Sequence, residues 1–155
     1  MSPGTTKRNL YERHYALLEE ILGQPPDLLQ AERTYRFRAS GFMDLVVEVL
    51  PHCAETGGMI VSLAHYFEQH GDLCQDPEMT VRLFHSDSVA FLEMVPSTDP
   101  RHGRAEALTF QQAIPPIFRE IYPEPGAYRP RLRRELNAFL GQWLRNLKAQ
   151  GHRLI

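Results

Sequence analysis

The sequence contains no long run of apolar residues. A helix that crosses a membrane needs ~18 of them in succession, and no stretch of the 155 residues comes close to that length. The first nine residues are polar, so they lack the apolar segment of a signal peptide. We therefore predict a protein that is neither secreted nor inserted in a membrane.

Cysteine is also scarce. The two cysteines, Cys53 and Cys74, lie far apart and form no CxxC pair. This excludes a disulfide framework and a zinc ribbon, both of which need more cysteines at closer spacing. Two isolated thiols are typical of a protein that works in a reducing compartment, and we predict a cytoplasmic location.

The signatures of common catalytic sites are absent. There is no HExxH for zinc and no GxSxG for a serine nucleophile. The pair Gly57-Gly58 precedes a predicted strand rather than a helix, which does not fit a phosphate-binding loop. The sequence thus assigns no catalytic residue, no metal site and no cofactor, and it leaves the question of an enzyme open with a non-enzyme favoured.

Charge is unevenly distributed along the chain. The net charge is −2, but from residue 126 onward there are seven basic residues and one acid. Such asymmetry indicates either a nucleic-acid surface or a basic helix that lies against an acidic body. Arg134 and Arg145 are the candidate nucleic-acid contacts. The isoelectric point of about 6.4 favours the intramolecular interpretation.

Hydrophobic spacing predicts an α+β fold, with an antiparallel meander of five to six strands between two helices. Asn9 and Glu12 form a capping-box pattern before the first helix, and Pro130 suits the first turn of the last. The predicted helices cover residues 10–22, 117–121 and 130–150; the predicted strands cover 35–40, 45–50, 59–67, 79–84, 89–94 and 105–110. No linker divides the chain, so we predict one domain over residues 1–155, with residues 1–8 flexible.

Polar side chains gather in residues 65–78, which we predict to be largely loop. The segment holds two histidines, four carboxylates and a thiol, the groups that bind metals or move protons near neutral pH. A loop between strands is a common place for a site. Ordinary turn residues explain the same composition, so a structural loop, a binding loop and a metal site built from His65, His70 and Asp72 stay open.

Two segments suggest a family. Residues 79–85 (MTVRLFH) and 135–144 (ELNAFLGQWL) resemble the YqiB-like bacterial proteins, a domain of unknown function. The 65–73 segment (HYFEQHGDL), with residues 76–79 and 143–147, resembles a second, related group of uncharacterised bacterial proteins. Together the likeness spans residues 34–151 and implies no activity. In the related group asparagine usually stands where this chain has His70, which implies that the loop does not need His70 as a metal ligand.

We arrive at three functional hypotheses. The leading one is a non-catalytic binding or regulatory protein that contacts a protein or small molecule through His65, Gln69, Asp72 and Asp76. The second is a hydrolase in which His65 is the general base, oriented by Asp72 or Glu68. The third is a nucleic-acid-associated protein that uses the basic C-terminal helix. The sequence fixes neither the partner nor the oligomeric state.

Overall fold

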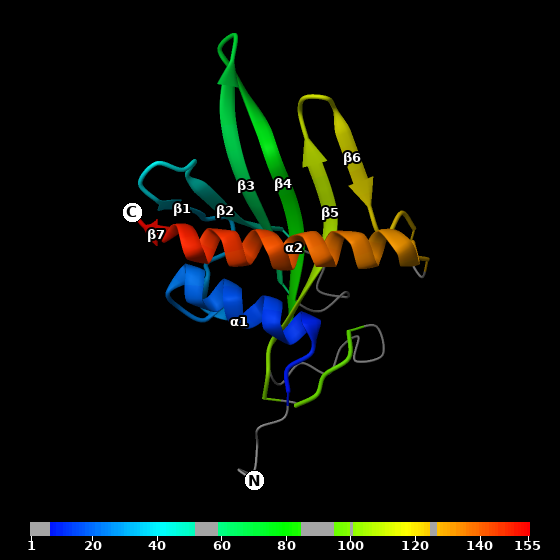
Figure 1. Ribbon diagram of the computed structural model, residues 1–155. Coiled ribbons are helices and arrows are strands. Elements are labelled where there is room, and N and C mark those ends of the chain that lie inside the picture. The colour runs from blue at the N-terminus through cyan, green and yellow to red at the C-terminus, as the bar shows by residue number, and fades with distance from the viewer. Residues whose placement is uncertain (1–6, 52–58, 85–94, 100, 125–126) are drawn as a thin grey trace.

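The computed structural model describes residues 7–51, 59–84, 95–99, 101–124 and 127–155. These residues form two helices and a seven-stranded antiparallel sheet, with strand order β6-β5-β4-β3-β2-β1-β7 (Figure 1). The elements are α1 (Leu10–Leu22), a 3₁₀ turn η1 (Pro26–Leu28), β1 (Thr34–Arg38), β2 (Leu45–Leu50), β3 (Met59–Gln69), β4 (Asp72–Phe84), β5 (Arg104–Gln112), β6 (Ile117–Glu120), α2 (Pro130–Gln150) and β7 (Arg153–Leu154). The α+β prediction is confirmed. No helix within these ranges is long and apolar enough to span a membrane.

Both helices lie on one face of the sheet, and α2 runs across the strands (Figure 1). The apolar stripe predicted for α2 supplies the contact, because Leu136, Leu140, Leu144 and Leu147 are all buried. They pack on strand residues that alternate toward the helices and form one core with them. The β3–β4 and β5–β6 hairpins extend past α2, and among the described residues no helix covers their far ends (Figure 1).

The strand ladder is interrupted at two places. His65 on β3 faces two residues of β4, since the register moves between Ala64 and Tyr66. Leu108 is an extra residue on β5, where the register moves between Thr80 and Val81 of β4. Bulges of this kind leave backbone or side-chain groups without their usual ladder partners.

Helix α2 places a polar side chain at each interruption. Asn137, buried beneath the helix, accepts the Ala107 amide at 2.9 Å beside the β5 bulge and donates to the Arg133 carbonyl at 2.8 Å. Trp143 directs its indole N–H to His65 Nε2 at 3.4 Å. The two α2 residues are six positions apart, about 9 Å along a helix, which matches the ~10 Å between β3 and β5, two strand spacings.

Two predictions about individual elements are wrong, and one strand was not predicted. The 68–77 segment is not a loop, because β3 continues to Gln69 and β4 begins at Asp72. Strand β6 (Ile117–Glu120) stands where a helix over residues 117–121 was predicted. The prolines on either side leave too few residues for a stable helix, whereas pairing with β5 satisfies the backbone. Strand β7 was not predicted, and the predicted strand 89–94, Cys53 and residues 1–6 lie outside the described residues.

The capping box at the start of α1 is confirmed and is part of a larger network. Asn9 and Glu12 exchange side-chain-to-backbone hydrogen bonds of 2.9 Å. The buried Glu12 carboxylate also accepts the Thr98 hydroxyl at 2.6 Å and lies 3.1 Å from His102 Nδ1. Burial alone would raise the pKa of Glu12, but these donors hold it below its ordinary value. The network therefore ties the segment before β5 to the first turn of α1.

His14 lies in the contact between α1 and the rest of the core. It is 1% exposed, and its Nδ1–H donates to the Ala105 carbonyl at 3.2 Å. Helix α2 comes close here because Gly141 has no side chain; a methyl group on Gly141 would lie 3.1 Å from His14 Nε2. Burial lowers the pKa of His14 from 6.5 to about 4.

We expect Asn137→Ala to lower the free energy of unfolding by about 1–3 kcal/mol, since the buried Ala107 amide would lose its acceptor. Urea denaturation measures the change. Asn146→Ala is the control, because Asn146 is exposed on the same helix, and it should change stability by less than ~0.5 kcal/mol. Equal effects of the two substitutions would contradict a specific role for Asn137.

His14 should make the fold sensitive to acid. Its pKa is lower in the folded protein, so its contribution to stability is complete above pH 6.5 and declines as the pH falls toward 4. Over this pH interval the free energy of unfolding of the wild type should fall by about 3 kcal/mol more than that of the His14→Gln variant. Urea titrations at several pH values give the comparison. The control is His70→Asn, which changes an exposed histidine in a turn and should keep the wild-type dependence of stability on pH. If His14→Gln lost as much stability in acid as the wild type, His14 would not be the source of the acid sensitivity.

Candidate functional site

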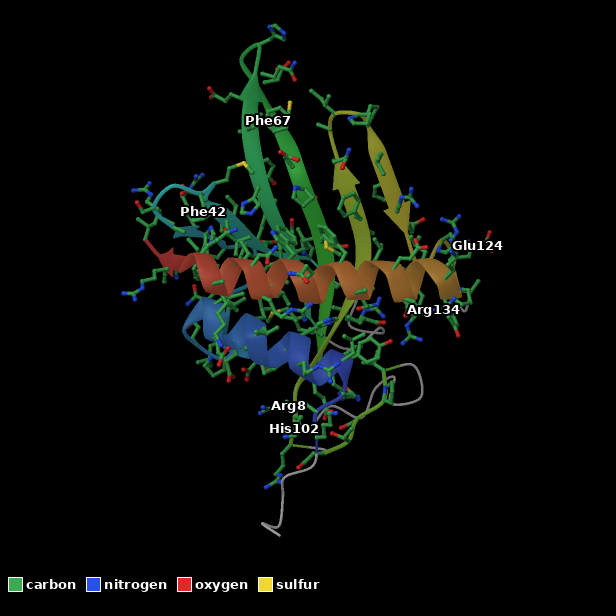
Figure 2. All side chains as sticks on the ribbon, in the orientation of Figure 1. Arg8, Phe42, Phe67, His102, Glu124 and Arg134 are labelled. Atoms are coloured by element: carbon green, nitrogen blue, oxygen red, sulfur yellow. The ribbon has the colours of Figure 1, made fainter. Side chains whose placement is uncertain are left out.

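Residues 65–78 form the far part of the β3–β4 hairpin. Gln69 pairs with Asp72, and the two residues between them, His70 and Gly71, have φ values of 53° and 85°. Positive φ at both central positions is the signature of a type I′ turn, whose twist suits a two-residue hairpin. The segment is therefore a rigid ribbon with a narrow tip. Figure 2 shows Phe67 on the part of this ribbon that projects past α2.

His65 lies at the base of that ribbon and is 7% exposed. Its Nδ1 lies 2.8 Å from the Asp44 carbonyl, which can only accept, so Nδ1 carries the proton. Its Nε2 then accepts the Trp143 indole N–H. Burial lowers the pKa of His65, while the bond to Asp44 and the nearby Asp76 charge act in the other direction. Both ring nitrogens are thus engaged within the fold.

The four residues predicted to act together are not brought together. His65 lies under α2, whereas Gln69 and Asp72 are exposed at the tip, four residues further along β3. Four strand residues span about 13 Å. Asp76 is exposed on β4 within the bulge opposite His65. Within the described ranges, no group of three or more His, Cys, Asp or Glu side chains has an arrangement that could hold a metal ion.

The basic residues predicted for nucleic acid lie on α2 beside α1. Arg134 and Arg145 are both exposed and are eleven residues apart, about 16 Å along a helix. Arg134 borders a hollow of about 180 Å³ together with Tyr11, and Arg145 donates to Gln142 at 3.2 Å. Acidic groups of the protein body form ion pairs with other cations of this helix. One example is Lys148, whose Nζ lies 2.7 Å from Glu20 Oε2.

One buried ionic cluster was not anticipated from the sequence. Glu106 on β5 is fully buried and accepts the Tyr122 hydroxyl at 2.7 Å, with Arg133 Nη2 at 3.7 Å. Burial raises the pKa of Glu106, and the Tyr122 and Arg133 contacts oppose that effect. The Arg133 guanidinium lies over the rings of Tyr11 and Tyr128, 5.4 Å from each. Arg133 is thus a cation of the basic helix that pairs with an acid of the protein body, in line with the intramolecular interpretation of the charge asymmetry.

One hollow lies between β6 and the first turns of α2. It measures about 480 Å³. Its walls are formed by Phe118, Arg119, Arg129, Arg131, Leu132 and Glu135. One signal of this hollow is present in the sequence, the excess of basic residues from position 126 onward, but the predicted helix at 117–121 hid the contribution of β6.

Comparison with protein families gives one match. Residues 16–153 match the model of DUF6908, described as a domain of unknown function. No curated protein and no solved structure matches the chain.

We expect Trp143→Phe to destabilise the protein by about 1 kcal/mol, because the ring remains while His65 Nε2 loses its donor. A double-mutant cycle with His65→Leu tests the cause. If the indole–imidazole bond contributes, the two substitutions should be coupled by at least ~0.5 kcal/mol in urea denaturation. Strict additivity would show that Trp143 acts on stability through packing alone.

Proposed function

We propose that this chain, which belongs to the DUF6908 family of domains of unknown function, is a non-catalytic binding protein of the bacterial cytoplasm. The observation that carries the proposal is the β3–β4 hairpin, which projects past α2 (Figure 1). Its far part, residues 67–74, is called the hairpin end from here on. A partner can reach it from both faces, since neither α1 nor α2 lies over it (Figure 1).

The hairpin end combines apolar and polar groups in a small area. Leu73 is 66% exposed, and Gln69 and Asp72 are exposed beside it. Apolar side chains bordered by polar ones are typical of protein interfaces. The type I′ turn fixes the backbone in advance, so binding would cost little ordering of the chain. These features support recognition of a protein partner.

The contacts of His65 disfavour the hydrolase alternative. A general base must reach a bound water or substrate with an unprotonated nitrogen. His65 Nδ1 is protonated toward Asp44, and Nε2 faces the Trp143 indole beneath α2. The same contacts explain the presence of a histidine here as a link between a strand bulge and a helix.

The likeness to YqiB-like proteins and the nucleic-acid alternative remain predictions. Arg134 and Arg145 form no dense cationic patch, because they are separated along α2 and other cations of that helix pair with acids. Nucleic-acid binding through phosphates would need several cations that act together. The hairpin end has the stronger structural support.

Site-specific photocrosslinking in living cells tests the proposal. The crosslinking residue p-benzoylphenylalanine would replace Gln69 or Leu73, both exposed at the hairpin end. We expect the same partner to be captured from both positions. Asp72→Ala combined with Asp76→Ala should weaken that capture, because polar groups bordering an interface fix its orientation.

The matched control places the crosslinking residue at Ala149, which is exposed on α2 away from the hairpin end. Capture of the same partner from Ala149 would mean contact without specificity. Absence of any product from Gln69 and Leu73, in cells where the folded protein accumulates, would refute the proposal.

A further inference from the structure

The hollow between β6 and α2, called the arginine groove from here on, has the charge and the open edge that an acidic peptide requires. It is separate from the hairpin end, because it lies on edge strand β6, and β5 stands between β6 and the β3–β4 hairpin. Its lining carries three arginines and one glutamate, together with two apolar side chains. The following contacts show how much of this surface is already engaged.

The arginines of the groove are weakly engaged by the protein itself. Arg131 pairs with Glu135 at 3.0 Å, but the two side chains are 86% and 51% exposed. A surface pair of this kind contributes little to stability and exchanges readily for another carboxylate. Arg129 donates to the Glu120 carbonyl at 3.1 Å. Within the described ranges, neither Arg119 nor Arg129 has a carboxylate at ion-pair distance.

Strand β6 has an open backbone edge. It is the first strand of the sheet order, so it pairs with β5 on one side only. The Ile121 amide points inward to the Leu108 carbonyl, whereas the Glu120 carbonyl points outward to Arg129. Because these directions alternate along a strand, the backbone N–H and C=O of Phe118 also point outward. No partner strand within the described residues receives them.

Apolar surface accompanies this edge. Phe118 is 60% exposed, and the half-buried Leu132 lines the same hollow. An extended peptide places alternate side chains on one side, about 7 Å apart. Carboxylates at alternate positions would meet the arginines, and the side chains between them would cover Phe118.

We infer that the arginine groove binds an extended acidic segment of a partner protein, added along the edge of β6. The carboxylates of that segment pair with Arg119, Arg129 and Arg131, and its backbone bonds to Phe118. A peptide suits the groove better than a nucleic acid, because Glu135 lies in the lining and the floor offers a strand edge. The inference does not depend on the hairpin end and can succeed or fail independently.

Fluorescence anisotropy with synthetic peptides provides the test. The probe is a short fluorescein-labelled peptide that alternates glutamate with valine, and its companion carries glutamine in place of glutamate. We expect the glutamate peptide to bind at least about tenfold more tightly at low salt, with the difference shrinking as salt is added. Equal affinity for the two peptides, or no binding of either, would overturn the inference.

Variants locate the binding. Combining Arg119→Glu with Arg131→Glu should lower the affinity for the glutamate peptide by about tenfold or more, because attraction between opposite charges becomes repulsion between like charges. Arg153→Glu is the matched control, an exposed arginine beyond the opposite end of α2, and should leave affinity within about twofold. If Arg153→Glu lost a comparable share of the affinity, net charge alone would explain the effect, and the arginine groove would not be the binding site.

Two further measurements separate the alternatives. Phe118→Pro removes the outward N–H of residue 118 while the pairing with β5 remains, since proline is tolerated on edge strands. This variant should lower the affinity for the peptide more than Phe118→Ala does. Equal losses would overturn addition along the strand. A fluorescent oligothymidylate that binds more tightly than the peptide and is lost in the Arg119/Arg131 variant would assign the groove to nucleic acid and overturn the peptide inference.

Discussion

The arrangement of the whole molecule depends on how α2 compensates for the two interruptions of the sheet. A bulge bends a strand and leaves polar groups without ladder partners, and a helix laid over the sheet would bury them at a cost. Here the helix brings Asn137 to one bulge and Trp143 to the other. Their six-residue separation fixes both the position and the direction of α2 across the strands. The apolar stripe then supplies most of the burial but does not determine the register.

Local signals explain what could be predicted from the sequence. The capping box of Asn9 and Glu12 and the hydrophobic spacing of α2 each depend on residues within a few turns of one helix. Strand β2 is bounded as expected because a proline follows it. These features require no knowledge of the rest of the chain, and the fold class follows from their order.

The remaining features depend on contacts between distant residues. Polar composition indicated a loop near Gln69 and Asp72, yet pairing across a two-residue turn turns both into strand residues. His65 looked like a candidate base because a sequence cannot show that Asp44 and Trp143 will occupy its two nitrogens. Glu106 attracted no attention because its partners come from the end of β6 and from α2. Register and burial, rather than residue type, decided each case.

The projection of the β3–β4 hairpin past α2 has an evolutionary consequence. The residues near its tip pack against neither α1 nor α2, and within the described part of the chain they are held by cross-strand pairing. Selection on stability therefore acts strongly under the helix and weakly at the tip. Substitutions of Gln69, Asp72 and Leu73 therefore cost little stability, so one scaffold can acquire a new binding specificity by changing a few exposed residues.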